Sequence, residues 1–411
     1  MPTDAALLTA LQSRGVIIHA PSATVLEGLD PDRFEAGAEI HPGTTLRGPR
    51  TAVGAGAHIG RAGGGWFEDT VVGRGADLYG GVYTDAVVLD GVKARGHAEV
   101  RGGTLIEEGG ELAHHVGYKM TITLPFVVAG SVINFCDALF AGGTSRSDHG
   151  EIGSCLAHYN YTPWGDKFAS LFGDVPRGVF LRSPRVFVGG QTQIVAPVCV
   201  GFGTTIAAGC ALRRNVGDGL LVGDPIPSIA EDTRLDTRRY GDLTTKLLNT
   251  ATYVGNLQAL AAWYRAVRMP LAADAFERLL WAEAQAQIAA GVAERIKRVG
   301  KLVKKLPASI EVLRAGVADG SIAADRGAKR IAHQQAIVDG WDACRAAWSA
   351  SRDVDLTALV ATMAELREAG ASYVDAVRDA RVDAHVASST AALEGVVAAC
   401  VTPTKTLLAT G

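Results

Sequence analysis

The sequence has little that would suit a secreted, membrane-spanning or nucleic-acid-binding protein. No run of 18 apolar residues occurs among its 411 residues, and the opening MPTDAALLTALQSRG has no basic start followed by an apolar stretch. Neither a signal peptide nor a membrane-spanning helix is therefore predicted. The formal net charge is only −3, from 40 basic and 43 acidic residues, which gives no general attraction to a polyanion. We expect neither a membrane nor a nucleic-acid partner.

Cysteine is also sparse. The six Cys residues are scattered and form no CxxC pair, so the spacing predicts neither a disulfide framework nor a Cys-based metal site, and no metal is expected. Such residues are most often small buried apolar groups. Free thiols suit a reducing compartment, so we expect a cytoplasmic protein.

Glycine, in contrast, is abundant, with 49 residues, about 12% against an average nearer 7%. It accompanies aliphatic residues at six-residue spacing: Val188, Ile194, Val200, Ile206 and Leu212; Val88, Ala94, Val100, Ile106 and Leu112; and shorter pieces at Phe34, Ile40 and Leu46, at Val53 and Ile59, and at Val72 and Leu78. A period of six fits neither an α-helix nor plain strand alternation. It predicts a β-solenoid of hexapeptide repeats, in which three hexads make one coil of a triangular prism and the aliphatic residues stack inside. A Gly-rich antiparallel barrel would instead need hairpin turns and alternation.

The composition divides the chain into regions. An N-terminal helix is expected at 1–15 and the solenoid at 16–230, with a polar insertion at 113–187 where the hexads are not visible. Insertions in a solenoid form loops on one face, often the binding face. Residues 231–411 are Ala-rich and Gly-poor, with helical apolar spacing, and predict an all-α C-terminal domain. Its helices are expected at 236–268, 270–305, 308–317, 322–350 and 355–399. The basic residues between Arg295 and Lys305 are expected on a solvated helix face.

Three segments carry a resemblance to a known family. FVGGQTQIVAPVCVGFGTTIAAGCALRRNVGDG (187–219) resembles the acetyltransferase half of the GlmU family, the glucosamine-1-phosphate acetyltransferases, some of whose relatives are labelled UDP-N-acetylglucosamine pyrophosphorylase. HYNYTPWGDK (158–167) is similar to that family's Asn-Tyr-Asp-Gly-x-x-Lys segment, and His115-Val-Gly-Tyr118 to its His-x-x-Tyr. The resemblance implies a left-handed parallel β-helix that forms a homotrimer, with ligands held between neighbouring subunits. The family's nucleotidyltransferase half has no counterpart in the sequence.

The resemblance also implies roles for individual residues. Acetyl transfer to an amine needs a base, and His is the usual base near neutral pH. His115 takes this role by the motif, while His149 and His158, in the polar segment, are alternatives. The implied substrate-binding residues are Tyr118, Asn160, Tyr161, Lys167 for a phosphate, and Arg177, with Arg182 and Arg185 as further cations nearby. Trp164 is either a packed loop anchor or a surface for a sugar ring.

The resemblance implies acetyl-CoA as the co-substrate. Gly190 and Ala208 would admit its pantetheine arm, and Arg213 and Arg214 would hold its phosphates. The sequence therefore predicts an acyl(acetyl)transferase that acts on a sugar phosphate or a nucleotide sugar. The alternative is a non-catalytic β-helix scaffold or a sugar-nucleotide-binding protein. Gly190 stands where the family has Ser, which favours that alternative.

Overall fold

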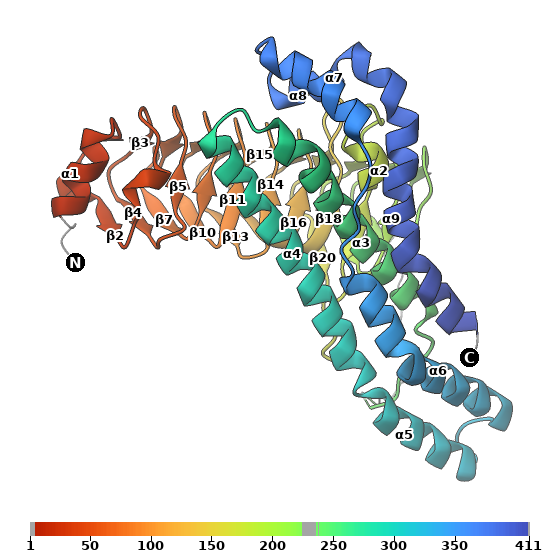
Figure 1. The fold of residues 1–411 in the computed structure, drawn as a ribbon. Helices are drawn as coiled ribbons and strands as arrows, with labels where there is room; N and C mark the ends of the chain where they lie inside the picture. Colours follow the sequence, from red (N-terminus) through yellow and green to blue (C-terminus); the bar gives the residue numbers. More distant parts are fainter. Residues whose placement is uncertain (1–4, 224–235, 237, 410–411) are drawn as a thin grey trace.

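The computed structural model describes residues 5–223, 236 and 238–409, and it consists of a parallel β-solenoid of about 11 turns followed by a region of several helices (Figure 1). This confirms the predicted fold class. Helix α1 (Ala5–Ser13) covers the N-terminal end of the solenoid. The expected boundary near residue 230 lies outside the described residues.

Each coil of the solenoid contributes strands to three faces, and all the strand pairs within each face are parallel. The first face contains β1 (Ile17–Ile18), β3 (Glu39–Ile40), β6 (His58–Ile59), β9 (Asp77–Leu78), β12 (Lys93–Ala94), β15 (Glu111–Leu112), β17 (Val128–Ala129), β19 (Glu151–Ile152), β22 (Phe187–Val188), β25 (Thr205–Ile206) and β27 (Leu221–Val222). The second face contains β2 (Val25–Glu27), β4 (Thr44–Arg47), β7 (Gly65–Glu68), β10 (Gly81–Thr84), β13 (Ala98–Arg101), the first halves of β16 (Val116–Thr123) and β18 (Ile133–Phe140), β20 (Ala157–Tyr159), β23 (Gln193–Val195) and β26 (Ala211–Leu212). The third face contains β5 (Ala52–Val53), β8 (Val71–Val72), β11 (Ala86–Val88), β14 (Thr104–Ile106), the second halves of β16 and β18, β21 (Ser170–Phe172) and β24 (Cys199–Val200).

The hexad residues form the interior of the prism, as predicted. Every aliphatic residue of the predicted runs is at most 3% exposed. Burial of a Val, Leu or Ile side chain contributes roughly 1.5–3 kcal/mol, so the stacked column is the main source of solenoid stability. Backbone hydrogen bonds join the coils, as where the N–H of Gly189 donates to the carbonyl of Ile206 at 2.8 Å.

The predicted polar insertion at 113–187 is not an insertion. Strands β16 to β21 lie within this segment and pair with the coils before and after them. The hexad pattern disappears for two reasons. Large aromatic residues such as Phe135, Phe140 and Phe172 fill the core there, and the connections at 141–150, 160–169 and 173–186 are longer than a hexad turn.

The C-terminal region is helical, as predicted, but its last part is divided. The helices are α2 (Val175–Gly178), which lies within the solenoid, α3 (Thr244–Trp263), α4 (Ala275–Val303), α5 (Leu306–Ala318), α6 (Ala324–Ser349), α7 (Thr357–Glu368), α8 (Tyr373–Arg378) and α9 (Asp383–Ala409), with a π-helical turn at Tyr264–Arg268. The single helix expected at 355–399 is broken because Gly370 adopts a left-handed conformation (φ 92°) and Ser372 caps α8.

The helices cover the third face of the solenoid. Helix α4 packs against β8, β11 and β14, and α3 packs against β21 and α9, so the helical region lies across the C-terminal half of the prism (Figure 1). In the described part of the chain, Ala380–Ala409 is the helix long and apolar enough to cross a membrane by composition. It packs against α3 and α6, and 22% of its most apolar stretch is buried within the described structure.

Candidate functional site

A groove of about 780 Å³ opens between the second face of the solenoid and helix α4. Five cationic side chains line it: Arg101, Lys119, Lys167, Lys297 and Arg298. Three acidic side chains, Asp85, Asp137 and Glu294, and the amides of Asn134 and Asn160 also line it. The groove therefore brings together two residues that the sequence predicted to bind substrate, Asn160 and Lys167.

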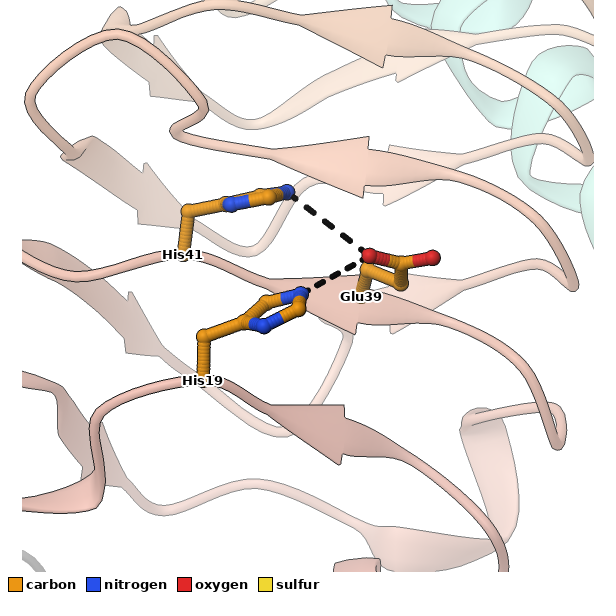
Figure 2. Close-up of side chains that lie close together, drawn as sticks. All are labelled: His19, Glu39 and His41. Atoms are coloured by element: carbon orange, nitrogen blue, oxygen red, sulfur yellow. Dashed lines mark hydrogen bonds and ion pairs between the residues drawn. The ribbon is translucent and has the colours of Figure 1, made fainter.

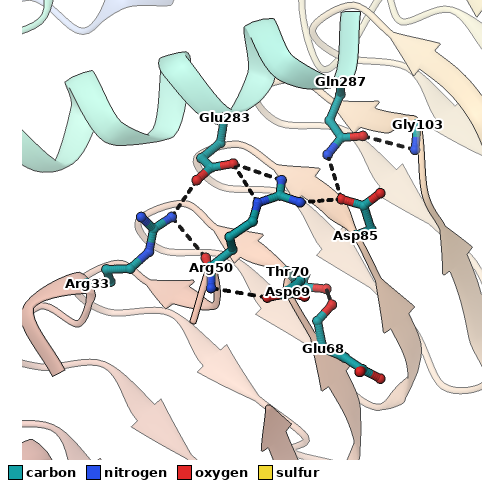
Figure 3. A network of polar contacts seen from close by, with 9 residues as sticks. All are labelled: Arg33, Arg50, Glu68, Asp69, Thr70, Asp85, Gly103, Glu283 and Gln287. Atoms are coloured by element: carbon teal, nitrogen blue, oxygen red, sulfur yellow. Dashed lines mark hydrogen bonds and ion pairs between the residues drawn. The ribbon is translucent and has the colours of Figure 1, made fainter. Parts of the chain in front are cut away.

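A network of polar contacts at the solenoid's second corner, where each coil turns from the second face to the third, holds α4 in place (Figure 3). The carboxylate of Glu283 on α4 accepts from Arg33 at 2.6 Å and from Arg50 at 2.8 Å, and Arg50 also pairs with Asp85 at 2.6 Å. One turn further along α4, the side chain of Gln287 accepts from the backbone N–H of Gly103 at 2.9 Å. These contacts join α4 to the coils of the solenoid, so they fix the position of the helical wall of the groove.

The register of the solenoid produces the cationic wall. Arg101 on β13 is paired with Lys119 on β16, and Lys119 is paired with Cys136 on β18. Neighbouring strands lie about 4.8 Å apart, so these side chains leave the same face one above the other. Burial raises the pKa of the Cys136 thiol, which keeps it protonated beside the two cations.

The acidic residues of the groove already have cationic or hydrogen-bonding partners. Asp137 is almost completely buried and forms an ion pair with the buried Arg295, and Asn160 donates to its second oxygen. Glu294 pairs with Arg298 at 2.6 Å and with Lys297 at 3.4 Å. The negative charge in the groove is therefore largely neutralised within the protein.

Two of the lysines have no such partner. Within the part of the chain that the structure describes, the ammonium groups of Lys119 and Lys167 form no ion pair or hydrogen bond, although both line the groove. The backbone fixes Lys167: its carbonyl accepts from Arg295 at 3.4 Å, and it forms an antiparallel bridge with Tyr161 across the 160–169 loop. The groove thus holds unneutralised positive charge at defined positions.

The expected catalytic histidines are dispersed. His115 is exposed at the first corner of the prism, where each coil turns from the first face to the second. Its ring stacks on that of His97 at 4.8 Å, and its Nδ1 lies 2.9 Å from Nδ1 of His114. His149 is half-buried beyond the third face, where Nε2 contacts Glu151 at 2.7 Å. Neither lines the groove.

The structure corrects the expectations for His158 and Tyr118. His158 is buried in the solenoid core, where Nδ1 donates to the carbonyl of Cys136 at 2.6 Å and Nε2 accepts from Ser170 at 2.8 Å. Burial lowers the pKa of His158 to about 4. Tyr118 is fully buried as well, and burial raises its pKa well above the ordinary value. Both side chains point inward from the second face and cannot contact a surface ligand.

The remaining substrate residues predicted from the 158–167 segment lie near the groove or anchor its loop. Tyr161 is 62% exposed at the start of the loop and is not part of the groove lining. Trp164 packs against Tyr240 and donates to the carbonyl of Arg239 at 3.3 Å. Of the two interpretations of Trp164, the contacts favour the loop anchor.

The predicted arginines make contacts within the protein. Arg177 pairs with Asp174 and Asp218, both at 2.6 Å, and lines a different cavity, of about 460 Å³, beside α3 and α9. Arg182 joins the solenoid to the helical region through Asp383 at 2.6 Å. Arg177 is thus separate from the groove that contains Lys167.

The predicted cofactor residues follow the same first corner as His115. Gly190 and Ala208 lie in consecutive coils, and the N–H of Gly209 donates to the carbonyl of Gly190 at 3.0 Å. With about 4.8 Å per coil, Gly190 lies three coils, or roughly 14 Å, from His115 along this edge. Arg213 and Arg214 are exposed after β26. The corner therefore unites His115, Gly190 and Ala208, which are far apart in sequence.

Sequence reasoning missed much of the groove. Arg101 and Lys119 stand one coil apart. Their spacing of 18 residues indicates that they are neighbours only once the length of a coil is known. The solvated helix face expected for the basic run is confirmed for the exposed Lys297, Lys301 and Lys304, and Lys297 and Arg298 also line the groove. The expectation is wrong for Arg295, which is buried and paired with Asp137.

Fold and groove together define the class: a parallel β-solenoid whose helical region closes a cationic groove on the second face. No family model matches the sequence.

Proposed function

We propose that the protein binds a phosphorylated sugar or a nucleotide sugar in the groove beneath α4. The observation that carries this proposal is the pair Lys119 and Lys167, whose ammonium groups face the groove without an acidic partner among the described residues. Arg101 stands in register with Lys119. Like charges on adjacent strands destabilise a sheet, and a bound phosphate removes this cost because it attracts both.

The remaining lining suits a sugar phosphate. A volume of about 780 Å³ lies within the range of roughly 300–1,000 Å³ that small-molecule sites occupy. The side-chain amides of Asn134 and Asn160 line the same space and provide hydrogen-bonding groups for sugar hydroxyls. The resemblance of the 158–167 segment to a sugar-phosphate-binding motif supports the same ligand class.

Calorimetric titration tests this proposal. Glucosamine 1-phosphate and UDP-N-acetylglucosamine are expected to bind, and neutral N-acetylglucosamine is not. Loss of one charge-assisted hydrogen bond costs about 1.5–3 kcal/mol, so Lys167→Ala is expected to weaken binding by roughly 10–150-fold. Lys93→Ala, on the exposed first face, is the matched control and should bind as the wild type does. Equal affinity in Lys167→Ala and wild type would contradict the proposal.

A second candidate, acyl transfer from acetyl-CoA, is favoured by the first corner. His115, Gly190 and Ala208 share this open edge. Within one chain the corner and the groove stand at opposite ends of the second-face strands, about 13 Å apart for the four residue steps from His115 to Lys119. The GlmU resemblance implies a homotrimer with ligands held between neighbouring subunits.

Two measurements address this second candidate. Light scattering should give three times 42.8 kDa if the trimer forms. If acetyl transfer to glucosamine 1-phosphate is detected, His115→Ala should lower kcat by roughly 10²–10⁴-fold, as expected for loss of a general base. If the protein is monomeric and does not bind acetyl-CoA, sugar-phosphate binding is the one proposed function that remains. The free cysteines suit a cytoplasmic location.

A further inference from the structure

A cluster of histidines around one glutamate lies on the first face of the solenoid, near its N-terminal end. Figure 2 shows three of its members, His19, Glu39 and His41, and His58 adjoins them. The side chains of the cluster come from the first three coils. His19 and His41 occupy equivalent positions after β1 and β3, since the backbone N–H of each donates to a carbonyl of the next coil. Glu39 on β3 is in register with His58 on β6. The coil repeat therefore brings the four residues together on the outside of the prism.

The donor atoms of these four residues converge. One oxygen of Glu39 lies 2.8 Å from Nε2 of His19, 3.3 Å from Nδ1 of His58 and 4.0 Å from Nε2 of His41. Nε2 of His41 lies 3.3 Å from Nδ1 of His58, and the donor atoms of His19, Glu39 and His41 all lie within 4.8 Å of one another. Figure 2 shows both of the labelled imidazole rings with a nitrogen directed at the carboxylate.

We infer that His19, Glu39, His41 and His58 form a binding site for one Zn²⁺ ion. Zinc is bound at about 2.0–2.1 Å by His nitrogens and at about 2.0–2.2 Å by carboxylate oxygens, usually in a tetrahedron. Donors at the corners of such a tetrahedron are separated by about 3.3 Å. The separations of Glu39 from the three histidines and of His41 from His58 lie between 2.8 and 4.0 Å, around this value, so side-chain rotations of His19 and His58 toward the carboxylate would bring the donors onto one ion.

The surroundings suit a bound cation with a structural role. The nearest guanidinium on the next coil, that of Arg61, is paired with Asp77 at 3.2 Å, and Asp77 is in register with His58. Four protein donors leave no open position for a substrate, which is typical of structural zinc. A terminal coil of a solenoid has a neighbour on one side only. The ion would hold the first three coils together at the end of the solenoid, where the terminal coil has only one neighbouring coil.

The chain offers a natural comparison. His97, His114 and His115 also lie together on the solenoid, with rings 4.8 and 5.1 Å apart, but no carboxylate is joined to them among the contacts of the described residues. The two clusters of histidines on the solenoid surface thus differ in the presence of an anionic donor. His97→Ala is the matched control for His41→Ala.

The test uses the full chain with any affinity tag removed, after dialysis against a chelator. Zn²⁺ is titrated calorimetrically, and Co²⁺ is followed by visible absorption, which is intense for tetrahedral coordination. One ion per chain is expected, with the tetrahedral Co²⁺ spectrum and a higher Tm in the presence of Zn²⁺. His41→Ala should weaken Zn²⁺ binding by more than about 100-fold, beyond the 10–100-fold typical of a lost outer-shell partner, whereas His97→Ala should not change it.

Glu39→Gln removes the charge with little change in shape, and circular dichroism verifies that each variant is folded. It should weaken binding as His41→Ala does. The inference is overturned if the folded wild type binds no ion stoichiometrically, if His97→Ala loses as much affinity as His41→Ala, or if Glu39→Gln binds Zn²⁺ as the wild type does. These outcomes do not depend on whether the groove beneath α4 binds a sugar phosphate.

Discussion

The burial of His158 makes the stability of the solenoid depend on pH. Its pKa is lowered to about 4, first by burial, from an ordinary value of 6.5. Between these two values the unfolded chain binds a proton that the folded chain does not, so the free energy of unfolding falls as the pH is lowered. The contribution is complete above pH 6.5 and is lost by about pH 4. At about 1.4 kcal/mol per pH unit, the loss amounts to about 3 kcal/mol.

Protonation also has a structural cost at this position. Nδ1 donates to the carbonyl of Cys136, so a second proton must enter at Nε2, where His158 accepts from Ser170. The hydroxyl of Ser170 also accepts from the backbone N–H of Val198 at 3.2 Å. Charging the ring would leave the Ser170 proton without its acceptor in the core, which explains why the neutral imidazole is favoured.

Urea titrations at pH 7, 6, 5 and 4 measure this effect in the wild type and in His158→Gln. Other groups titrate in both proteins, so the informative quantity is the difference between the two free energies of unfolding at each pH. Between pH 7 and pH 4 we expect the wild type to lose about 3 kcal/mol more of its free energy of unfolding than the variant loses. Parallel pH profiles, or an imidazole that titrates near pH 6.5 in the folded protein, would refute the assignment of His158 to the core.

Three further predictions concern the packing. Gly189→Ser should lower Tm because a Cβ there would meet the backbone of the next coil at 2.4 Å, whereas Gly190→Ser should lower Tm less because its nearest neighbour, a backbone oxygen, is 3.0 Å away; equal Tm values would contradict the corner geometry. Arg268→Met should lower the free energy of unfolding by about 3–5 kcal/mol in urea, since two buried acidic partners lose their cation, and a neutral effect would remove its role in holding the helices. Ile194→Asp should prevent folding or cost several kcal/mol by circular dichroism, unlike Gln193→Asp on the outer surface, and similar tolerance would show that the hexad register is wrong.

The core of the solenoid was predictable because its signal is local. Each aliphatic residue repeats after six positions, as from Ile194 to Val200, and any regular coil must bury them. The same signal failed at β16 to β21, because residues such as Phe135 fill the core with larger side chains and the connections change the spacing. A periodic pattern identifies coils only while their length is constant.

The groove and the histidine cluster were less accessible from sequence, since both depend on contacts between distant segments. Lys119 meets α4 only because the helical region folds back over the third face, and nothing local encodes this return. Glu39 and His58 stand one coil apart, at a spacing of 19 residues that resembles no metal-binding motif. Asn160 and Lys167, which the resemblance implies as substrate-binding residues, both line the groove, and their role stays a prediction. The resemblance also implied ligand contacts for the buried His158 and Tyr118, because a motif carries no information about which side chains point inward.

The most direct test of the proposed function is the affinity for glucosamine 1-phosphate of the wild type and of the double variant Lys119→Ala/Lys167→Ala, measured by calorimetry at two salt concentrations. The two ammonium groups line the groove without acidic partners in the described structure. We therefore expect binding by the wild type that weakens at higher salt, and no measurable binding by the folded double variant. Unchanged affinity in the double variant, or absence of binding by the wild type, would contradict the account.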